Sequence, residues 1–369
     1  MKIKGILLAA LIGGLASTVS HAQTALELDI TGGQTFKSAV INRAYQIFDG
    51  GAASTSSNVA DSNHISLEGT AAGVLGGNTT NVIVRLGFTS TEQGILDLAQ
   101  ANQVGFARTL AEGGGTALIS NIANVSFSDI FPGSVVPPQN VALFHEQVIG
   151  VVPFAFVGHS DLVFSNLTRE QAISFYEFSG ELTENFFTTN GSPSKTIYYF
   201  GRSNTAGARI VPEIDLAYVG SPQIYGFVGG QYTPTSGYTT ASSLVSAIAS
   251  TPATLGTAGI ADFLAGPSPN ADDFILTVEG YYPSPTNVAL GYYPIWSYDH
   301  AYTIRSGTNA LNSLQEELFT NLVAQLTNEV FQTSNAVYTN SFVALTHMQV
   351  NRLGDGTVII PGGGWPASN

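Results

Sequence analysis

The sequence predicts an α/β protein with two lobes. Segments with the alternating or continuous apolar pattern of strands are followed by segments with the three-to-four-residue spacing of amphipathic helices. This alternation favours mainly parallel sheets joined by helices. The 369 residues are enough for about two domains, yet no clear linker divides them. We therefore expect two lobes joined by more than one crossing of the chain.

The first residues have the layout of a secretory signal peptide. Two lysines precede an apolar run over residues 6–14, and small residues then lead to Ser20-His21-Ala22, a Ser-x-Ala cleavage site. The run is too short for a membrane span, and no later stretch approaches 18 uninterrupted apolar residues. We expect residues 1–22 to be removed and the mature protein to be periplasmic or secreted. The alternative is a buried N-terminal helix.

Composition excludes several classes of function. The chain has 12 Lys and Arg against 26 Asp and Glu, a formal charge of −14, and nucleic-acid binding selects the opposite balance. It has no cysteine, which excludes a disulfide framework, a thiol nucleophile, a cysteine zinc site and a lipid-modified cysteine. With 44% hydrophobic residues the chain can bury a full core.

The first third of the chain predicts two strand–helix units. Alternating aliphatic residues predict a strand over 26–30, and Thr35 is placed to cap a helix with an apolar face through residue 48. Residues 50–80 are rich in Gly, Ser, Asn and Ala and are interpreted as a long loop or an insertion. A second strand is expected over 82–88.

The second helix is expected to begin at Ser90, which with Gln93 has the spacing of a capping box. Residues 148–157 form a near-continuous apolar run, which is typical of a strand buried on both faces. Pro153 lies inside this run, and because proline lacks an N–H it suggests a sheet edge or a break.

The remaining elements follow the same pattern. Thr168 and Gln171 form a capping box that opens a helix to about residue 178, and residues 196–200 have a strand pattern. Residues 220–257 are rich in Gly, Ser, Thr and Pro. A long amphipathic helix is expected over 311–331.

Enzyme motifs are not found in the sequence. Gly158-His159-Ser160-Asp161 resembles a nucleophile elbow, but Leu162 stands where a glycine is needed. There is no phosphate-binding loop, dinucleotide fingerprint or His-Glu-x-x-His motif, and the histidines lack metal-ligand spacing. We expect a protein that is not an enzyme and that uses no metal and no cofactor.

A different feature recurs at three places, where a strand runs through Gly, Thr or Ser into the start of a helix. These turns cover residues 33–36, 89–94 and 201–209. Free backbone N–H groups at helix N-termini, with hydroxyl groups beside them, form an anion site that needs little formal charge. Arg202 adds a guanidinium suited to an oxyanion. Ordinary helix capping is the alternative interpretation.

Five segments carry short motifs in the same order as a known family. They are Asp29–Phe36, Phe127-Ser128-Asp129, Asn166–Ala172, Gly201–Arg209 and Gly291–Tyr298. In these segments the sequence resembles the phosphate-binding proteins of ABC transporters, which are type 2 periplasmic binding proteins. The resemblance covers almost all of residues 25–300.

The resemblance implies a two-lobed type 2 periplasmic-binding-protein fold with a ligand cleft between the lobes. Residues 23–150 and 290–369 are expected to form lobe I, and residues 151–289 lobe II. The implied function is capture of an oxyanion, with phosphate as the leading ligand, for an ABC importer or a sensor. The implied partners are the anion and an ABC permease of the inner membrane, with no nucleic acid.

The resemblance also implies the ligand-binding residues. Backbone and hydroxyl groups of Thr35 and Phe36 are expected to donate to the anion, Ser128 to add a hydroxyl, Asp129 to accept the proton of the ligand and Arg202 to clamp its charge. The full set implied is Thr35, Phe36, Thr91, Ser128, Asp129, Arg202, Gly207 and Arg209.

The sequence departs from the family in the turn at 201–209. Ala206 and Ala208 stand where the family has Ser and Thr, which removes two hydroxyl donors, and Arg209 adds a charge. Glu92 in the second turn is unfavourable beside a phosphate. These departures favour an alternative function, in which the protein keeps the fold, has lost phosphate binding and acts as a secreted or surface interaction protein.

Overall fold

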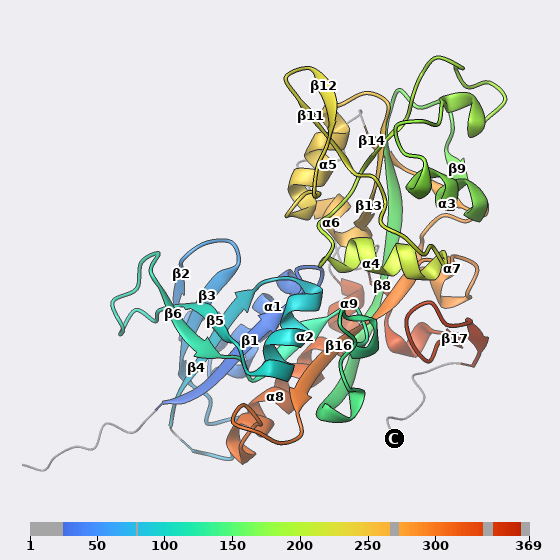
Figure 1. Ribbon diagram of the computed structural model, residues 1–369. Helices are drawn as coiled ribbons and strands as arrows, with labels where there is room; N and C mark the ends of the chain where they lie inside the picture. The colour runs from blue at the N-terminus through green and yellow to red at the C-terminus, as the bar shows by residue number, and fades with distance from the viewer. Residues whose placement is uncertain (1–24, 79, 266–272, 335–341, 363–369) are drawn as a thin grey trace, which may run out of the picture.

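The structure, a computed structural model, describes residues 25–78, 80–265, 273–334 and 342–362. The predicted signal peptide lies outside these residues. Figure 1 shows two lobes: lobe I carries α1, α2 and α8, and lobe II carries α3, α5 and α6. Among the residues that the structure describes, no helix has the length and apolar character needed to cross a membrane.

One sheet of ten strands runs through both lobes, in the order β10-β13-β8-β16-β7-β1-β4-β3-β2, with β14 also paired to β8. The pairs of β1 with β4 and β7, and of β10 with β13, are parallel, whereas the other pairs are antiparallel. The prediction of mainly parallel sheets is therefore wrong, because the strands that cross between lobes run against their neighbours. The strands are β1 (Leu26–Gly32), β2 (Ser56–Val59), β3 (His64–Thr70), β4 (Asn81–Phe88), β7 (Val125–Ser128), β8 (Phe144–His159), β10 (Tyr198–Phe200), β13 (Thr254–Gly259), β14 (Asp273–Ile275) and β16 (Trp296–Ile304).

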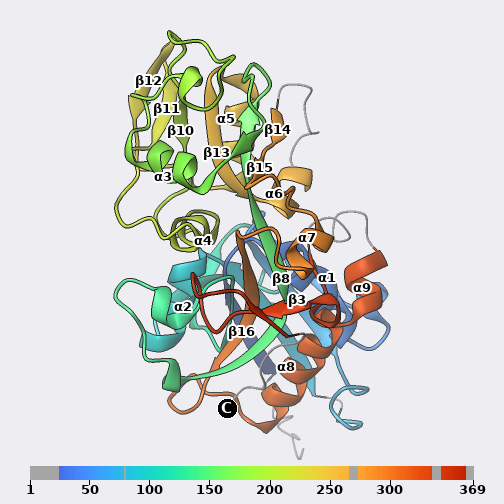
Figure 2. The same cartoon turned by 90° about the vertical axis from the view of Figure 1, so that its right-hand side faces the viewer.

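The long strand β8 connects the two lobes (Figure 2). Its first half pairs with β16, and its second half, from Phe154 onward, pairs with β13 and β14. The predicted buried strand is confirmed. Pro153 lies opposite Trp296, at the point where β8 changes partners, so its missing N–H falls where the ladder is interrupted.

Helices cover the sheet in both lobes. The capping prediction at Ser90 is confirmed, since its Oγ accepts from the N–H of Gln93. The capping box of Thr168 and Gln171 is also confirmed, with both reciprocal bonds formed. The helices are α1 (Lys37–Ala44), α2 (Thr91–Gln100), α3 (Arg169–Glu177), α4 (Gly207–Asp215), α5 (Ala241–Ser250), α6 (Ile260–Ala265), α7 (Pro285–Ala289), α8 (Ser313–Leu326) and α9 (Glu329–Ser334).

Short strand pairs complete the fold outside the main sheet. β5 and β6 form a hairpin in lobe I, and β11 and β12 form one in lobe II. The other pairs are β9 with β15 and β17 with β18. Their bounds are β5 (Gln103–Ala107), β6 (Leu118–Ile122), β9 (Asn166–Leu167), β11 (Tyr225–Val228), β12 (Gln231–Pro234), β15 (Thr277–Val278), β17 (Val350–Asn351) and β18 (Ile360–Pro361).

Two local predictions are wrong and one is incomplete. Thr35 does not cap α1: the N-cap is Phe36, which makes no side-chain bond, because the Thr35 hydroxyl donates elsewhere. Residues 50–80 are not only a loop, since β2 and β3 extend the main sheet and bury Ile65 and Leu67. The helix expected over 311–331 is divided into α8 and α9, because α8 ends at Leu326.

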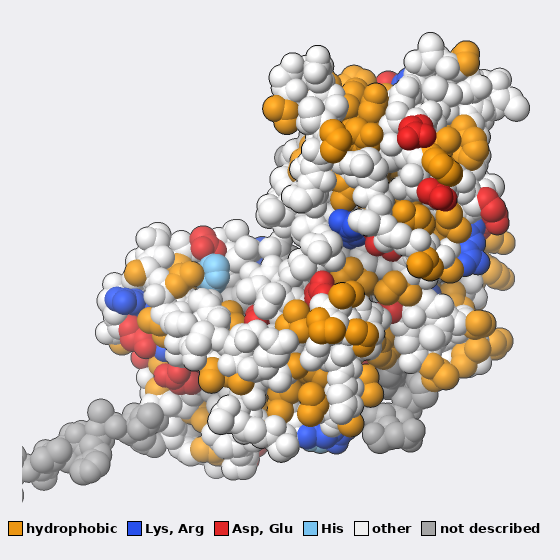
Figure 3. Space-filling model, viewed as in Figure 1, with side chains coloured by type: hydrophobic (Ala, Val, Ile, Leu, Met, Phe, Trp, Pro, Cys, Tyr) orange, Lys and Arg blue, Asp and Glu red, His pale blue; other side chains and the backbone are white. Residues whose placement is uncertain are grey.

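The surface has few charges, as Figure 3 shows for one face, where uncharged and hydrophobic groups dominate. The main core is built from aliphatic and aromatic side chains of both lobes, including Leu28, Val84, Phe156 and Leu255. The strand β13 is buried at all six positions, although it lies in the Gly/Ser/Thr-rich segment. The sheet thus provides a rigid base for the turns that end its strands.

Candidate functional site

Three turns of lobe I meet at one edge of the main sheet. The strands β4, β1 and β7 are parallel neighbours, so the turns that follow them lie side by side. Their approach is close: a Cβ on Gly33 would lie 2.6 Å from Thr91 Oγ1, and a Cβ on Gly94 would lie 2.5 Å from the Cα of Gly32. Glycine at positions 33 and 94 is therefore what lets the starts of α1 and α2 come together.

Asp129 follows β7 and lies at the centre of this group. Its side chain is buried, and Thr35 Oγ1 donates to its Oδ2 over 2.7 Å. Its Oδ1 is also buried and accepts no hydrogen bond from any described residue. Burial raises the pKa of Asp129, against the lowering by the hydroxyl groups of Thr91 and Thr35 and by the charge of Arg202. Asp129 is a buried carboxyl group with one unused oxygen.

Lobe II brings the N-terminus of α4 onto this carboxyl group. A Cβ on Gly207 would lie 2.0 Å from Asp129 Oδ1, so only glycine allows the approach. In the described ranges, the N–H groups of Gly207 and Ala208 have no hydrogen-bond acceptor. Because the N-terminus of a helix is electropositive, this end of α4 attracts negative charge.

A second contact between the lobes lies at the start of α2. The N–H of Glu92 donates to the carbonyl oxygen of Thr205 over 3.2 Å. The carboxylate of Glu92 is bound by the N–H of Val136 over 2.9 Å. The lobes therefore touch at the N-termini of two helices, and the carboxylate of Glu92 is occupied by the N–H of Val136.

Arg202 is the cation of the cluster, and a loop of lobe II holds it in place. Its Nε donates to the carbonyl of Tyr238 over 3.2 Å, and its Nη2 donates to that of Thr239 over 3.1 Å. Burial lowers its pKa, against the raising by the charges of Asp262 and Asp129. Arg202 forms no ion pair within 4.0 Å among the described residues, so its charge lies near Asp129 without being neutralised by contact.

A cavity of about 260 Å³, lined by both polar and apolar groups, lies between the lobes and includes Thr35 in its wall. Asp262 of lobe II and Lys37 of lobe I are its charged residues. Burial raises the pKa of Asp262 to about 6, against the lowering by Arg202. Lys37 Nζ donates to Asn63 Oδ1 over 3.0 Å. The lining residues are Gln34, Thr35, Lys37, Ser38, Ala39, Ser62, Asn63, Thr240, Ala241, Ser242, Ala261, Asp262 and Phe342.

Two of the residues implied by the resemblance make their bonds elsewhere. The Oγ of Ser128 donates to the carbonyls of Thr91 and Ile130 and accepts from the N–H of Ile130, so it braces the turn. Arg209 Nε pairs with Glu213 Oε1 over 2.9 Å, one turn further along α4. The structure groups the rest of the implied set, namely Thr35, Phe36, Thr91, Asp129, Arg202 and Gly207, around the facing turns.

Sequence reasoning missed the charged residues of the cavity. Asp262 follows β13 in a segment without a motif, and it reaches the cleft only because β13 pairs with β8. Lys37 is adjacent to Phe36, so the start of α1 was the available signal for it. The carbonyl groups of Tyr238 and Thr239 that hold Arg202 carry no sequence signal at all.

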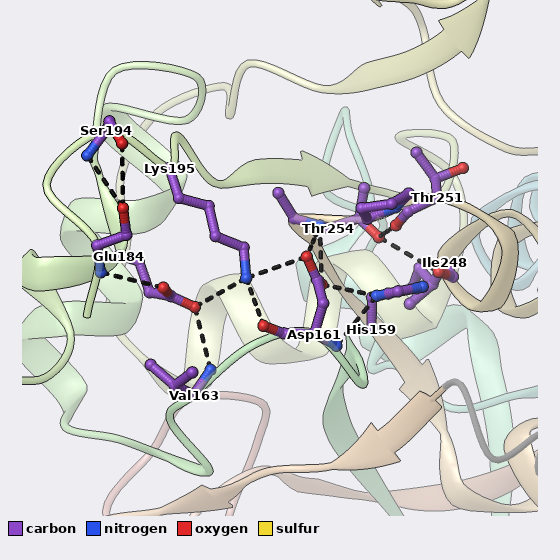
Figure 4. A network of polar contacts seen from close by, with 12 residues as sticks. His159, Asp161, Val163, Glu184, Ser194, Lys195, Ile248, Thr251 and Thr254 are labelled. Carbon is purple, nitrogen blue, oxygen red and sulfur yellow. Dashed lines mark hydrogen bonds and ion pairs between the residues drawn. The ribbon is translucent and has the colours of Figure 1, made fainter. Parts of the chain in front are cut away.

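The motif that resembles a nucleophile elbow belongs to a separate polar network in lobe II (Figure 4). Asp161 accepts from His159 Nδ1 over 2.6 Å and pairs with Lys195 Nζ over 3.0 Å. Lys195 also pairs with Glu184, again over 3.0 Å. Among the described residues no group of three or more His, Asp or Glu side chains could hold a metal ion.

No protein-family model matches the sequence, and no curated protein matches it significantly. Solved structures do match the fold. An ABC-type phosphate transport receptor from Vibrio cholerae is 14% identical, with a TM-score of 0.52 over 86% of this chain and 99% of that one. A protein from Clostridium perfringens, described as a phosphate ABC transporter substrate-binding protein and solved with bound phosphate, is 13% identical, with a TM-score of 0.54 over the same shares.

At this identity the likeness establishes the architecture. The two receptors align with this chain over nearly their whole length, so the mixed α/β arrangement of this chain is a fold that they share. The chain therefore shares the two-lobed α/β fold of these phosphate receptors.

Proposed function

We propose that the protein is an exported solute-binding protein that captures an oxyanion between its lobes, with phosphate as the leading ligand, and carries out no chemical step. One observation carries this proposal: the unused Oδ1 of Asp129 faces the N-terminus of α4, where the N–H groups of Gly207 and Ala208 lack acceptors. An anion there meets backbone donors from lobe II and a carboxyl group from lobe I.

Each residue of the proposed site has a separate role. Thr35 orients Asp129 through its hydroxyl, and the N-termini of α1 and α2 supply backbone N–H groups at Phe36 and Thr91. Arg202 balances the ligand charge from a fixed position, because two carbonyl groups hold its guanidinium.

Asp129 accounts for selectivity among oxyanions. A carboxylate oxygen without a donor accepts a hydrogen bond from a ligand that carries a proton, as phosphate does near neutral pH. Sulfate carries no proton, so it would place a negative oxygen against the same carboxylate. The proposed site therefore prefers phosphate to sulfate.

Binding is proposed to close the lobes about the two crossings, β8 near Pro153 and the segment that leads into β16. The division into residues 23–150 with 290–369 and residues 151–289 is part of this proposal. So are export by the signal peptide and delivery of the ligand to an ABC permease or a sensor, which the two phosphate receptors of the same fold support.

Isothermal titration of the ligand-stripped protein tests the proposal. We expect micromolar or tighter binding of phosphate and arsenate with little heat from sulfate. The variant Arg202→Ala should abolish binding, and Asp129→Asn should relax the discrimination against sulfate. An unchanged affinity in Arg202→Ala rejects the role of the guanidinium, and unchanged selectivity in Asp129→Asn rejects the role of the carboxyl group.

A second candidate function has its own supporting observation. The helix N-termini already meet groups of the protein itself, since Glu92 donates to Thr205 and Gly207 packs on Asp129. Such a site suits a secreted or surface interaction protein that keeps the fold without binding phosphate. A folded protein that gives no heat with any of the three anions supports this function over the first.

A further inference from the structure

We infer that the protein binds a phosphomonoester of a small polyol or sugar more tightly than it binds free phosphate. This inference rests on the proposed oxyanion site. The phosphoryl group lies at Asp129 and α4, and the hydroxylated carbon chain extends past Thr35 into the cavity beside it.

Thr35 joins the two parts of this extended site. Its hydroxyl faces Asp129, and its residue also lines the cavity. Its methyl group lies toward lobe II, where a Cβ on Gly259 would be 3.5 Å from Thr35 Cγ2 and 3.2 Å from Asp262 Oδ2. The cavity thus begins one side chain away from the anion position, within reach of a substituent on the phosphate.

The size of the cavity fits such a substituent. Its volume of about 260 Å³ lies just below the range of roughly 300–1,000 Å³ typical of small-molecule pockets. A site for one tetrahedral ion needs no further chamber. The space suits an organic group of a few carbon atoms.

The chemistry of the walls fits hydroxyl groups. Lys37 and Asn63 supply donors from lobe I, and Asp262 supplies acceptors from lobe II. Hydroxyl groups both donate and accept, so they satisfy a wall of this mixed kind. The other polar lining residues are Gln34, Ser38, Ser62, Thr240 and Ser242.

Asp262 is the decisive residue. It is only partly exposed, yet it makes no hydrogen bond and no ion pair within the described ranges. A second carboxylate near Asp129 repels a free phosphate ion, and in a partly buried site that repulsion is weakly screened. The same carboxylate accepts hydrogen bonds from ligand hydroxyl groups. Asp262 repels the phosphoryl group of both ligands, but only the ester offsets this repulsion with hydroxyl groups that donate to the carboxylate, so Asp262 favours the ester.

The first turn of α4 agrees with this assignment. Ala206 and Ala208 have methyl groups in place of donors, so this turn offers backbone N–H groups only. The bridging oxygen of an ester carries no formal charge and needs fewer donors than a terminal oxygen of free phosphate. The backbone N–H donors of this turn therefore suit the three terminal oxygens of an ester better than the four of free phosphate.

Competition titrations test the inference with inorganic phosphate, glycerol 3-phosphate, ribose 5-phosphate and glucose 6-phosphate. We expect at least one ester to bind about tenfold or more tightly than inorganic phosphate. The variant Asp262→Asn should bind that ester more weakly and inorganic phosphate more tightly. Asp61→Asn is the matched control, because Asp61 is near Lys37 but does not line the cavity, and its preference for the ester should remain.

A blocking variant provides an independent readout. Ser38 is exposed on the cavity wall, so Ser38→Leu fills the cavity from a position where a larger side chain does not disturb the core. It should lower the affinity for the ester about tenfold more than the affinity for inorganic phosphate.

The outcomes separate the inference from the function on which it rests. If inorganic phosphate binds and none of the three esters binds more tightly, the ester is rejected and the oxyanion site stands. An equal loss of affinity for the ester and for inorganic phosphate in Asp262→Asn also rejects the ester. If neither phosphate nor any ester binds to the folded protein, both proposals are overturned.

Discussion

The buried carboxyl groups around Asp129, between the lobes, have surroundings very different from those of Asp161 and Glu184 inside lobe II. Asp161 and Glu184 share Lys195, and each accepts backbone N–H groups as well (Figure 4). Asp129 instead has a buried oxygen without a donor, and Asp262 has no partner among the described residues.

This difference distinguishes a polar cluster that stabilises the fold, around Asp161, from one that is available to a ligand, around Asp129. Although burial opposes it, the N–H of Ala253 and the ammonium of Lys195 hold the pKa of Asp161 below its usual value. Burial dominates at Asp129 and raises its pKa. A network with every acceptor filled stabilises the fold, whereas unfilled acceptors facing free N–H groups are available to a ligand.

The largest effect on binding is expected from Gly207→Ala. The added Cβ would lie 2.0 Å from Asp129 Oδ1, so the lobes cannot approach as they do here. Titration should show a loss of phosphate affinity of about 100-fold or more. Gly133→Ala is the control, because its Cβ meets nothing within 4 Å. Wild-type affinity in Gly207→Ala would mean that closure at α4 is not part of binding.

The largest effect on stability is expected in the network of Asp161, Lys195 and Glu184, from the substitution Glu184→Ala. This change leaves Lys195 and the N–H groups of Val163 and Ser192 without their carboxylate. The free energy of unfolding should fall by about 2–3 kcal/mol in urea titrations. The exposed Glu181→Ala should change it by less than about 0.5 kcal/mol. Similar values for both variants would show that the network is not structural.

The two clusters should respond to pH in opposite directions. The pKa of Asp262 is about 6 in the folded protein and near 3.9 when unfolded, so its ionisation favours unfolding as pH rises. The stability that protonated Asp262 contributes is therefore lost as the pH rises from about 4 to about 6. Asp161 has a lowered pKa, and its contribution is lost as pH falls below about 4.

Unfolding free energies of Asp262→Asn and Asp161→Asn, compared with wild type across pH 3–7, check these signs. The free energy of unfolding of Asp262→Asn should increase relative to that of wild type as the pH rises from about 4 to about 6. Asp161→Asn should have a lower free energy of unfolding than wild type, and this difference should become smaller only below about pH 4. Parallel curves for the two variants would remove the distinction between the clusters.

The smallest effect is expected from Arg209→Gln. Arg209 is committed to Glu213 along α4, so its loss should change phosphate affinity by about twofold or less. Arg202→Gln removes the cation held near Asp129 and should cost far more. A larger loss of phosphate affinity in Arg209→Gln than in Arg202→Gln would show that Arg209 is the cation that binds the ligand.

Strong patterns in the sequence predicted much of the fold. The apolar run at 148–157 became the core of β8, and the capping spacings placed α2 and α3. The hairpin of β2 and β3 was missed, because Ser, Asn and Gly surround the alternation of Ile65 and Leu67. The antiparallel share of the sheet was missed because pairing partners depend on contacts distant in sequence.

The candidate site was predictable where it follows strand ends. Thr35, Asp129 and Gly207 come from turns with recognisable residue types, and the structure brings them together. Asp262 was not predictable, since a single Asp without a motif reaches the cleft only through the pairing of β13 with β8. The pairing of Arg209 with Glu213 depends on helix geometry, in which residues four apart are neighbours.

One measurement tests the central claim most directly: phosphate titration of wild type, Asp129→Asn and Asp161→Asn side by side, with sulfate as the second ligand. We expect wild type and Asp161→Asn to bind phosphate equally and to discriminate against sulfate, while Asp129→Asn loses that discrimination. Loss of phosphate binding in Asp161→Asn, with Asp129→Asn unchanged in affinity and selectivity, would contradict the placement of the ligand between the lobes.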